Sequence, residues 1–236
     1  MKHLFKQAFA LRESQCTIIS DKETATKTAV ESIKRNRGEL EEFAKVNPKF
    51  LWTLKPFPVP EAPLAAKLMA EAAWKADVGP MAAVAGVLAD LAVKDMLADG
   101  CEVAVVEDGG EVSAVSDVPV DVAVAAGDAP LSRRFGFRLT EFPIGVATSS
   151  GRFSHALSFG DAEAATVFCR CAGLADAAAT AVGNVVKGED VDGAIERGIA
   201  AAKAIHGVEG TMILYKGKVG TWGKMPKIIQ VDDASQ

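Results

Sequence analysis

The spacing of apolar and polar residues along the chain predicts several amphipathic helices. Between residues 22 and 46, apolar side chains recur every three or four positions among charged ones, and Asn47-Pro48 ends the pattern. The same reasoning predicts further helices over residues 64–76, 80–99, 173–187 and 191–205. Pro80 at the start and Gly100 after the end of the second of these agree with the usual boundaries of a helix.

Short apolar runs between the helices predict strands. Residues 3–20 read as two strands with a turn near residues 12–14, and a hairpin is predicted at Gly109-Gly110, because two glycines supply the positive φ angles of a tight turn. Other strands are predicted over residues 103–106, 112–115, 120–125, 138–148 and 164–169, with a second hairpin over 211–222. The proline cluster at residues 55–63 predicts a stiff connector.

This order of elements favours an α+β fold. Strands and helices do not alternate strictly, so antiparallel sheets packed with Ala-rich helices are expected rather than a doubly wound parallel sheet. An Ala-rich helix precedes a hairpin in residues 80–116 and again in residues 174–222, which suggests two related halves. We interpret residues 1–236 as a single domain, with the connector at residues 55–63 as the place where it would subdivide.

Composition narrows the class of function. The chain has 236 residues and a net charge of −5 without a Lys/Arg block, which argues against nucleic acid as the partner. No uncharged apolar run is long enough to cross a membrane and the first residues lack a secretory pattern, so a cytoplasmic protein with no membrane partner is expected. Self-association remains an alternative to a monomer.

Common catalytic motifs are absent from the sequence, and the cysteines are few. There is no dinucleotide-binding fingerprint after a strand, no phosphate-binding P-loop and no G-x-S-x-G nucleophile turn. Cys169 and Cys171 would share one face of a predicted strand, where two thiols could bind a soft metal or carry sulfur. Because no second Cys or His pair accompanies them, buried structural cysteines are the favoured interpretation.

Asp176 and Thr180 are the strongest candidates for metal chemistry. Four positions apart on a predicted helix, they would present two oxygens on one face to a hard cation such as Mg²⁺. The alternative is structural: an Asp near a helix N-terminus and a Thr that bonds back to a carbonyl. The first turn of this helix, around Leu174, could receive a phosphate through its free N–H groups. His155 is either a general acid or base or an ordinary structural histidine.

Several of these segments, in this order, resemble one family. V-E-D-G-G-E-V at residues 106–112, V-A-T-S-S-G at 146–151, His155, and L-A-D-A-A-A-T-A at 174–181 are similar to motifs of the ApbE-type FAD:protein FMN transferases. With G-P-M-A-A-V-A-G at residues 79–86, the chain resembles still more an uncharacterised ApbE-like family of cytoplasmic proteins.

The resemblance implies a T-fold-like architecture and a site for FAD or another flavin nucleotide with Mg²⁺. It implies that Asp176 and Thr180 are metal ligands and that His155 is the catalytic histidine. The implied cofactor-binding residues are Gly109, Gly110, Thr148, Ser149, Ser150 and Gly151.

The chain departs from the transferase pattern after His155. Where the family has H-I-I-D-P, residues 155–159 read H-A-L-S-F, so the acidic residue is replaced by Ser158. A Mg²⁺-dependent flavin-nucleotide site without turnover is therefore the favoured function. The alternatives are a transferase-like enzyme and, from a link of the ApbE-like family to sulfur assimilation and homocysteine formation, an accessory protein of that pathway.

Overall fold

The structure, a computed structural model, describes residues 2–123, 135–150 and 160–230. Its helices are α1 (Glu23–Val46), α2 (Lys49–Trp52), α3 (Leu64–Ala76), α4 (Val84–Ala98), α5 (Ala172–Val185) and α6 (Val191–Ala204), with a 3₁₀ turn η1 (Pro80–Ala83) before α4. Its strands are β1 (Phe5–Leu11), β2 (Ser14–Ser20), β3 (Ala104–Asp108), β4 (Glu111–Val115), β5 (Val120–Ala123), β6 (Phe135–Leu139), β7 (Ile144–Ser149), β8 (Ala164–Cys169), β9 (Val208–Tyr215), β10 (Lys218–Gly223) and β11 (Lys227–Gln230).

The strands form two antiparallel sheets. The large sheet has the order β1-β2-β3-β4-β7-β8-β9-β10, and the small one has the order β11-β6-β5. Neighbouring strands are antiparallel in both sheets. The prediction of an α+β fold with antiparallel sheets and Ala-rich helices is confirmed.

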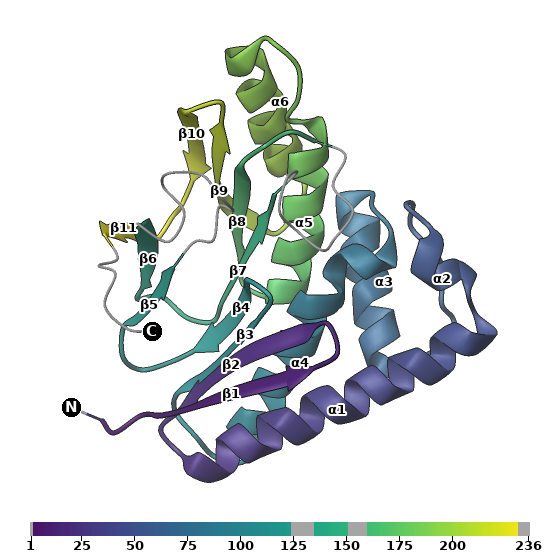
Figure 1. Cartoon of the computed structure of the whole chain (residues 1–236), viewed down its shortest axis with the longest axis vertical. Helices are drawn as coiled ribbons and strands as arrows, with labels where there is room; N and C mark the ends of the chain where they lie inside the picture. The colour runs from purple at the N-terminus through teal and green to yellow at the C-terminus, as the bar shows by residue number, and fades with distance from the viewer. Residues whose placement is uncertain (1, 124–134, 151–159, 231–236) are drawn as a thin grey trace.

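The large sheet separates two apolar cores. Helices α1, α3, α4, α5 and α6 lie on one side of it, and the small sheet lies on the other (Figure 1). Because side chains alternate along a strand, Val146 of β7 joins the core beneath the small sheet, whereas its neighbour Ala147 joins the core beneath the helices. Strand β7 therefore contributes alternate residues to two separate environments.

Most predicted elements are confirmed within a few residues, and the exceptions have local causes. Residues 138–148, predicted as one extended segment, instead belong to two strands: β6 in the small sheet and β7 in the large one, separated by bends at residues 141–143. Helix α2 and strand β11 are only four residues long, too short for a periodic pattern to reveal.

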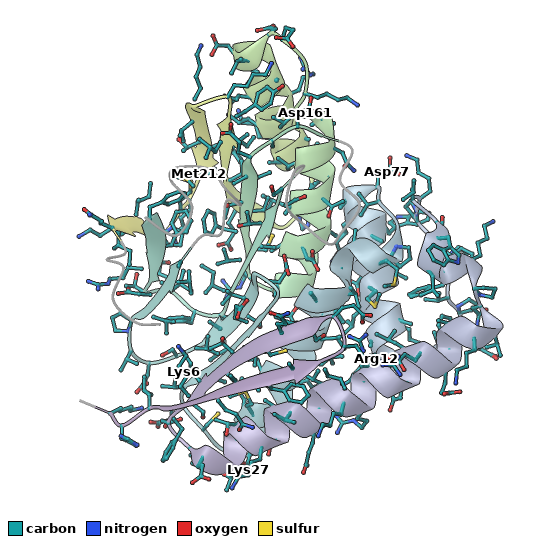
Figure 2. All side chains as sticks on the ribbon, viewed as in Figure 1. Lys6, Arg12, Lys27, Asp77, Asp161 and Met212 are labelled. Atoms are coloured by element: carbon teal, nitrogen blue, oxygen red, sulfur yellow. The ribbon has the colours of Figure 1, made fainter. Side chains whose placement is uncertain are left out.

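Helix α1 lies along the β1–β2 hairpin and against α4. Figure 2 places Arg12 at the tip of this hairpin, where its guanidinium pairs with Glu41 of α1 at 2.9 Å. Within the described residues, no single helix has the length and apolarity of a membrane span. Only α3 taken with the η1–α4 segment passes that test, as a pair bent by 102°.

Candidate functional site

The site is built where α4 and α5 cross beside β7. Gly86 of α4, Gly145 of β7 and Gly173 of α5 meet at this crossing. A Cβ on Gly86 would overlap the carbonyl group of Ala172, and a Cβ on Gly145 would overlap the backbone between Cys171 and Ala172. Glycine is therefore required here for the close approach of three backbones, which fixes how the two helices lie relative to the sheet.

Asp176 projects from α5 towards the first turn of α4. Its Oδ2 accepts a hydrogen bond from the Gly86 N–H at 3.0 Å. As the fifth residue of α5, Asp176 lies too far into the helix to cap the N-terminus of α5. It caps the neighbouring helix α4 instead, a structural role different from the one expected. Thr180 lies one turn further along α5 and is buried, and among the described residues its hydroxyl forms no bond back to a helix carbonyl.

Asp90 of α4 makes the reciprocal contact with α5. Its Oδ1 accepts a hydrogen bond from the Ala172 N–H at 2.9 Å, and its Oδ2 accepts one from the Gly173 N–H at 2.8 Å. These N–H groups belong to the first turn of α5, whose own N-cap residue, Cys171, provides no side-chain bond. The expectation of a phosphate on the first turn of this helix is wrong for these two donors, because a carboxylate of the chain already occupies them.

Strand β4 carries a further carboxylate, Glu111, which lies near Asp176. Glu111 and the neighbouring Asp108 of β3 face each other across the β3–β4 pair. Burial raises the pKa of Glu111 well above its usual range, and the charges of Asp176 and Asp108 raise it further. We call Asp90, Asp108, Glu111 and Asp176 the acidic seam.

Burial also dominates the electrostatics of the other members of the seam. It raises the pKa of Asp176 to about 7, with Asp108 and Asp90 adding to the rise and the Gly86 N–H opposing it. Asp108 is 2% exposed, accepts a hydrogen bond from the Ser14 hydroxyl at 3.1 Å, and also has a pKa raised by burial. Neither Glu111 nor Asp176 forms an ion pair within the described residues. Arg37 lies near enough to Asp108 to lower its pKa in part, whereas Glu111 and Asp176 carry their negative charge without an ion-pair partner among the described residues.

The predicted glycine hairpin joins β3 to β4 beside the seam. Gly109 and Gly110 have φ angles of 68° and 114°, as the prediction required, and the Gly110 N–H donates to Glu107 at 2.8 Å. Apart from Gly110 and its chain neighbours, no atom of the described residues lies within 4 Å of the position that a Cβ would take on Gly110. The turn therefore leaves open space beside the strand that carries Glu111.

The predicted residues of β7 divide between the two faces of the sheet. Ser149 follows Ala147 on the helix side, the side of Asp176, whereas Thr148 lies on the opposite side, where its hydroxyl bonds that of Thr166 at 2.9 Å. Ser150 is 6% exposed, and its Oγ has no hydrogen-bond partner among the residues that the structure describes. Gly151 and His155 lie outside the described residues.

The two cysteines of the C-x-C sequence occupy different environments. Cys169 ends β8 and is buried, whereas Cys171 lies beyond the strand and is exposed, so the prediction of one shared strand face is wrong. Burial raises the pKa of both thiols, and a neighbouring negative charge raises each further, from Cys171 for Cys169 and from Asp90 for Cys171. Raised thiol pKa values oppose the formation of the thiolate that metal binding or sulfur transfer requires. All four cysteines are free thiols.

The described residues contain no group of three or more His, Cys, Asp or Glu side chains arranged to hold a metal ion by themselves. A pocket of about 170 Å³ lies elsewhere, between the β6–β7 connection and residues 224–227, with Arg170 and Glu209 among its lining. The acidic seam, by contrast, brings together carboxylates from α4, α5, β3 and β4 within the described residues.

The fold is that of ApbE-like proteins. The family model described as AbpE bacteria matches residues 4–206. The UPF0280 protein of Methanococcus maripaludis strain C5 is 36% identical over 233 residues, which cover 97% of this chain and 94% of the relative. That of Methanosarcina acetivorans is 37% identical over 231 residues, covering 96% and 90%. The chain belongs to this ApbE-like family, together with the UPF0280 proteins.

Solved structures of more distant proteins share the fold. The flavinyl transferase ApbE of Pseudomonas stutzeri, in its apo form, superposes with a TM-score of 0.62 at 15% identity and 94% coverage of both chains. The ApbE protein of Thermotoga maritima superposes with a TM-score of 0.56 at 13% identity, covering 98% of this chain and 97% of its own. At these identities the likeness concerns the fold.

Sequence reasoning missed three members of the seam: Asp90, Asp108 and Glu111. Asp108 and Glu111 belong to the segment V-E-D-G-G-E-V, in which only the glycines were assigned a role. Asp90 is an acidic residue within an otherwise apolar stretch of α4, and a charge on a buried helix face signals a specific partner. The partner of Asp90, the first turn of α5, can be identified only from the crossing of α4 and α5.

Proposed function

We propose that this chain binds a flavin nucleotide together with Mg²⁺ at the acidic seam. The observation that carries the proposal is the meeting of Glu111 and Asp176, two carboxylates with raised pKa values and no ion-pair partner among the described residues. Two such groups repel each other when both are ionised, and a divalent cation between them and a ligand's phosphates would remove that repulsion.

The residues present suit Mg²⁺. This cation prefers oxygen ligands and keeps several of its waters, so that proteins commonly hold it through one or two carboxylates together with phosphate oxygens of the ligand. Asp176 and Glu111 would supply the carboxylates and Thr180 a hydroxyl.

Two further features suit a phosphorylated ligand. The Oγ of Ser150, just after β7, is a buried hydrogen-bonding group without a partner in the described part of the chain, and such groups usually have one. The open turn at Gly109-Gly110 would let a ligand approach the backbone beside β4. The solved structures with the same fold include flavin transferases, which favours a flavin over other nucleotides.

In this proposal the chain's residues bind and orient the ligand. Bound Mg²⁺ would supply positive charge that neutralises the pyrophosphate. Asp176 would hold the cation while remaining anchored to the Gly86 N–H, and Glu111 would approach it from β4. Because Ser158 replaces the acidic residue of the transferase motif, we favour binding without transfer of FMN.

Calorimetric titration with FAD, with and without Mg²⁺, tests the proposal. The wild-type protein should bind FAD only when Mg²⁺ is present, and Asp176→Ala should weaken this binding about tenfold or more. Asp192→Ala, which removes an exposed carboxylate on α6, is the matched control and should bind like the wild type. Binding that is independent of Mg²⁺ and unchanged in Asp176→Ala would refute the proposed site.

A second measurement separates binding from turnover. The complex of protein, FAD and Mg²⁺ is incubated for hours, and AMP is assayed by chromatography. We expect no AMP above the level of the Asp176→Ala variant. Release of AMP by the wild type alone would establish a working pyrophosphate-cleaving site and replace the binding function by the transferase-like one.

A further inference from the structure

Asp90 connects two elements that carry different members of the acidic seam. On one side, its Oδ1 accepts a hydrogen bond from the Ser113 hydroxyl of β4 at 2.7 Å. On the other side, its two oxygens accept the Ala172 and Gly173 N–H groups of α5 at 2.9 and 2.8 Å. A single carboxylate of α4 is therefore bound to the strand and to the helix at once.

These attachment points lie close in sequence to the residues that would face the ligand. Ser113 is two positions after Glu111 on β4, so both side chains point to the same face of the sheet. Asp176 is one helical turn after Ala172 on α5. We propose that Asp90 is a positioning residue that sets the separation of the Glu111 and Asp176 carboxylates, a role that rests on the proposed function of the seam.

An ordinary N-cap residue would not attach α5 to β4. A Ser or Asp at position 171 could satisfy the first N–H groups of α5 locally, but it would leave α5 unattached to β4. Here Cys171 forms no side-chain cap, and the cap comes from α4. A negative charge at this end of the helix is also favoured by the helix dipole, which helps to offset the burial of Asp90.

The contact between α4 and α5 is reciprocal, which makes it rigid. Asp90 of α4 holds the first turn of α5, and Asp176 of α5 holds Gly86 in the first turn of α4. Gly86 and Asp90 are one turn apart on α4, so the two carboxylates lie on the same side of the crossing. Loss of the side-chain bonds of Asp90 should therefore also weaken the bond between Asp176 and the Gly86 N–H, to which the Asp90 side chain makes no hydrogen bond.

Amide hydrogen exchange tests the inference without any ligand. In Asp90→Asn, one side-chain oxygen remains as an acceptor and the other is replaced by an amide that cannot accept. Exchange at Gly173 should accelerate, and exchange at Gly86 should accelerate with it about tenfold. Asp95→Asn, on the same helix but paired with Arg35, is the control and should leave Gly86 unchanged. Asp90→Asn and Ser113→Ala keep the exchange measurement available if the larger change Asp90→Ala prevents folding.

Titration with Mn²⁺, followed by its electron paramagnetic resonance signal, tests the effect on the site. Asp90→Asn and Ser113→Ala should weaken Mn²⁺ binding in the presence of FAD about tenfold, the size expected for partners that orient metal ligands, and Ser113→Thr should restore it. Unchanged Gly86 exchange in Asp90→Asn, or an equal loss of binding in Asp95→Asn, would overturn the positioning role. A wild-type protein that binds no Mn²⁺ would refute the proposed function instead, and the exchange at Gly86 would still decide the role of Asp90.

Discussion

For Asp176, the sequence predicts which residue shares its helix face, whereas only the structure shows its contacts with other elements. Its spacing from Thr180 predicts a shared helix face, and α5 contains both residues. The sequence could not predict its contact with Gly86 or its proximity to Glu111, because these residues come from other elements and meet it only through tertiary packing. Local periodicity determines which residues share a face, whereas the partner of that face depends on the fold.

The raised pKa of Asp176 predicts how stability depends on pH in the absence of metal. A carboxyl group whose folded-state pKa lies near 7, above its unfolded value near 3.8, favours folding at low pH and loses this contribution as pH rises through the folded pKa. The melting temperature of the metal-free protein should therefore fall between pH 5 and pH 8, by about 5 °C or more.

Two variants isolate the contribution of Asp176 to this pH dependence. Asp176→Asn cannot ionise at this position and should flatten the curve of melting temperature against pH. Asp121→Asn should not, because Arg138 lowers the pKa of Asp121, and that carboxylate is already ionised throughout this range. Parallel curves for the wild type and Asp176→Asn would show that Asp176 titrates normally.

At the scale of elements, helices and hairpins were predictable because their signals are local. Helix α3 begins and ends at the predicted residues, and the positive φ angles of Gly109 and Gly110 follow from the turn that two glycines imply. The run of small residues at 79–86 indicates close packing, but the requirement for glycine at position 86 depends on a partner that this run does not identify. It arises from the backbone of α5 lying against α4.

Two glycines within helices should respond oppositely to the same substitution. Gly86→Ala places a methyl group on the carbonyl of Ala172 and should lower the free energy of unfolding by about 2–3 kcal/mol or more. Gly38→Ala, on α1 with no atom within 4 Å of the new Cβ, should raise it by about 0.5–1 kcal/mol. Urea unfolding measures both changes, and equal effects at the two positions would contradict the close crossing of α4 and α5.

At the scale of the whole molecule, the α+β class could be predicted but the layering could not. The order of strands and helices indicated antiparallel sheets, yet nothing in residues 138–148 showed that the chain leaves one sheet for another. The small sheet is held by a separate core, in which Phe137 packs edge-to-face on Phe168 with ring centres 4.8 Å apart. Both rings are 1% exposed or less.

Truncation of Phe137 should therefore loosen one side of the molecule. Phe137→Ala should cost about 3–5 kcal/mol of unfolding free energy and accelerate amide exchange in β5, β6 and β11, while the crossing of α4 and α5 keeps its protection. Ile228→Ala, which trims a side chain that is 50% exposed on β11, should cost less than about 0.5 kcal/mol. Exchange that rises equally on both sides of the large sheet would show that the two cores are not independent.

The meeting of Gly86, Gly145 and Gly173 also limits how this family can diversify. Where backbones touch without side chains between them, substitution has no room to reshape a binding surface, so Asp176 is presented from an invariable platform. At the turn beside β4, a Cβ on Gly110 would meet open space, but the positive φ angles of Gly109 and Gly110 disfavour other residues there as well. For the nucleotide binding proposed above, a change of ligand should therefore leave the three glycines of the crossing unchanged.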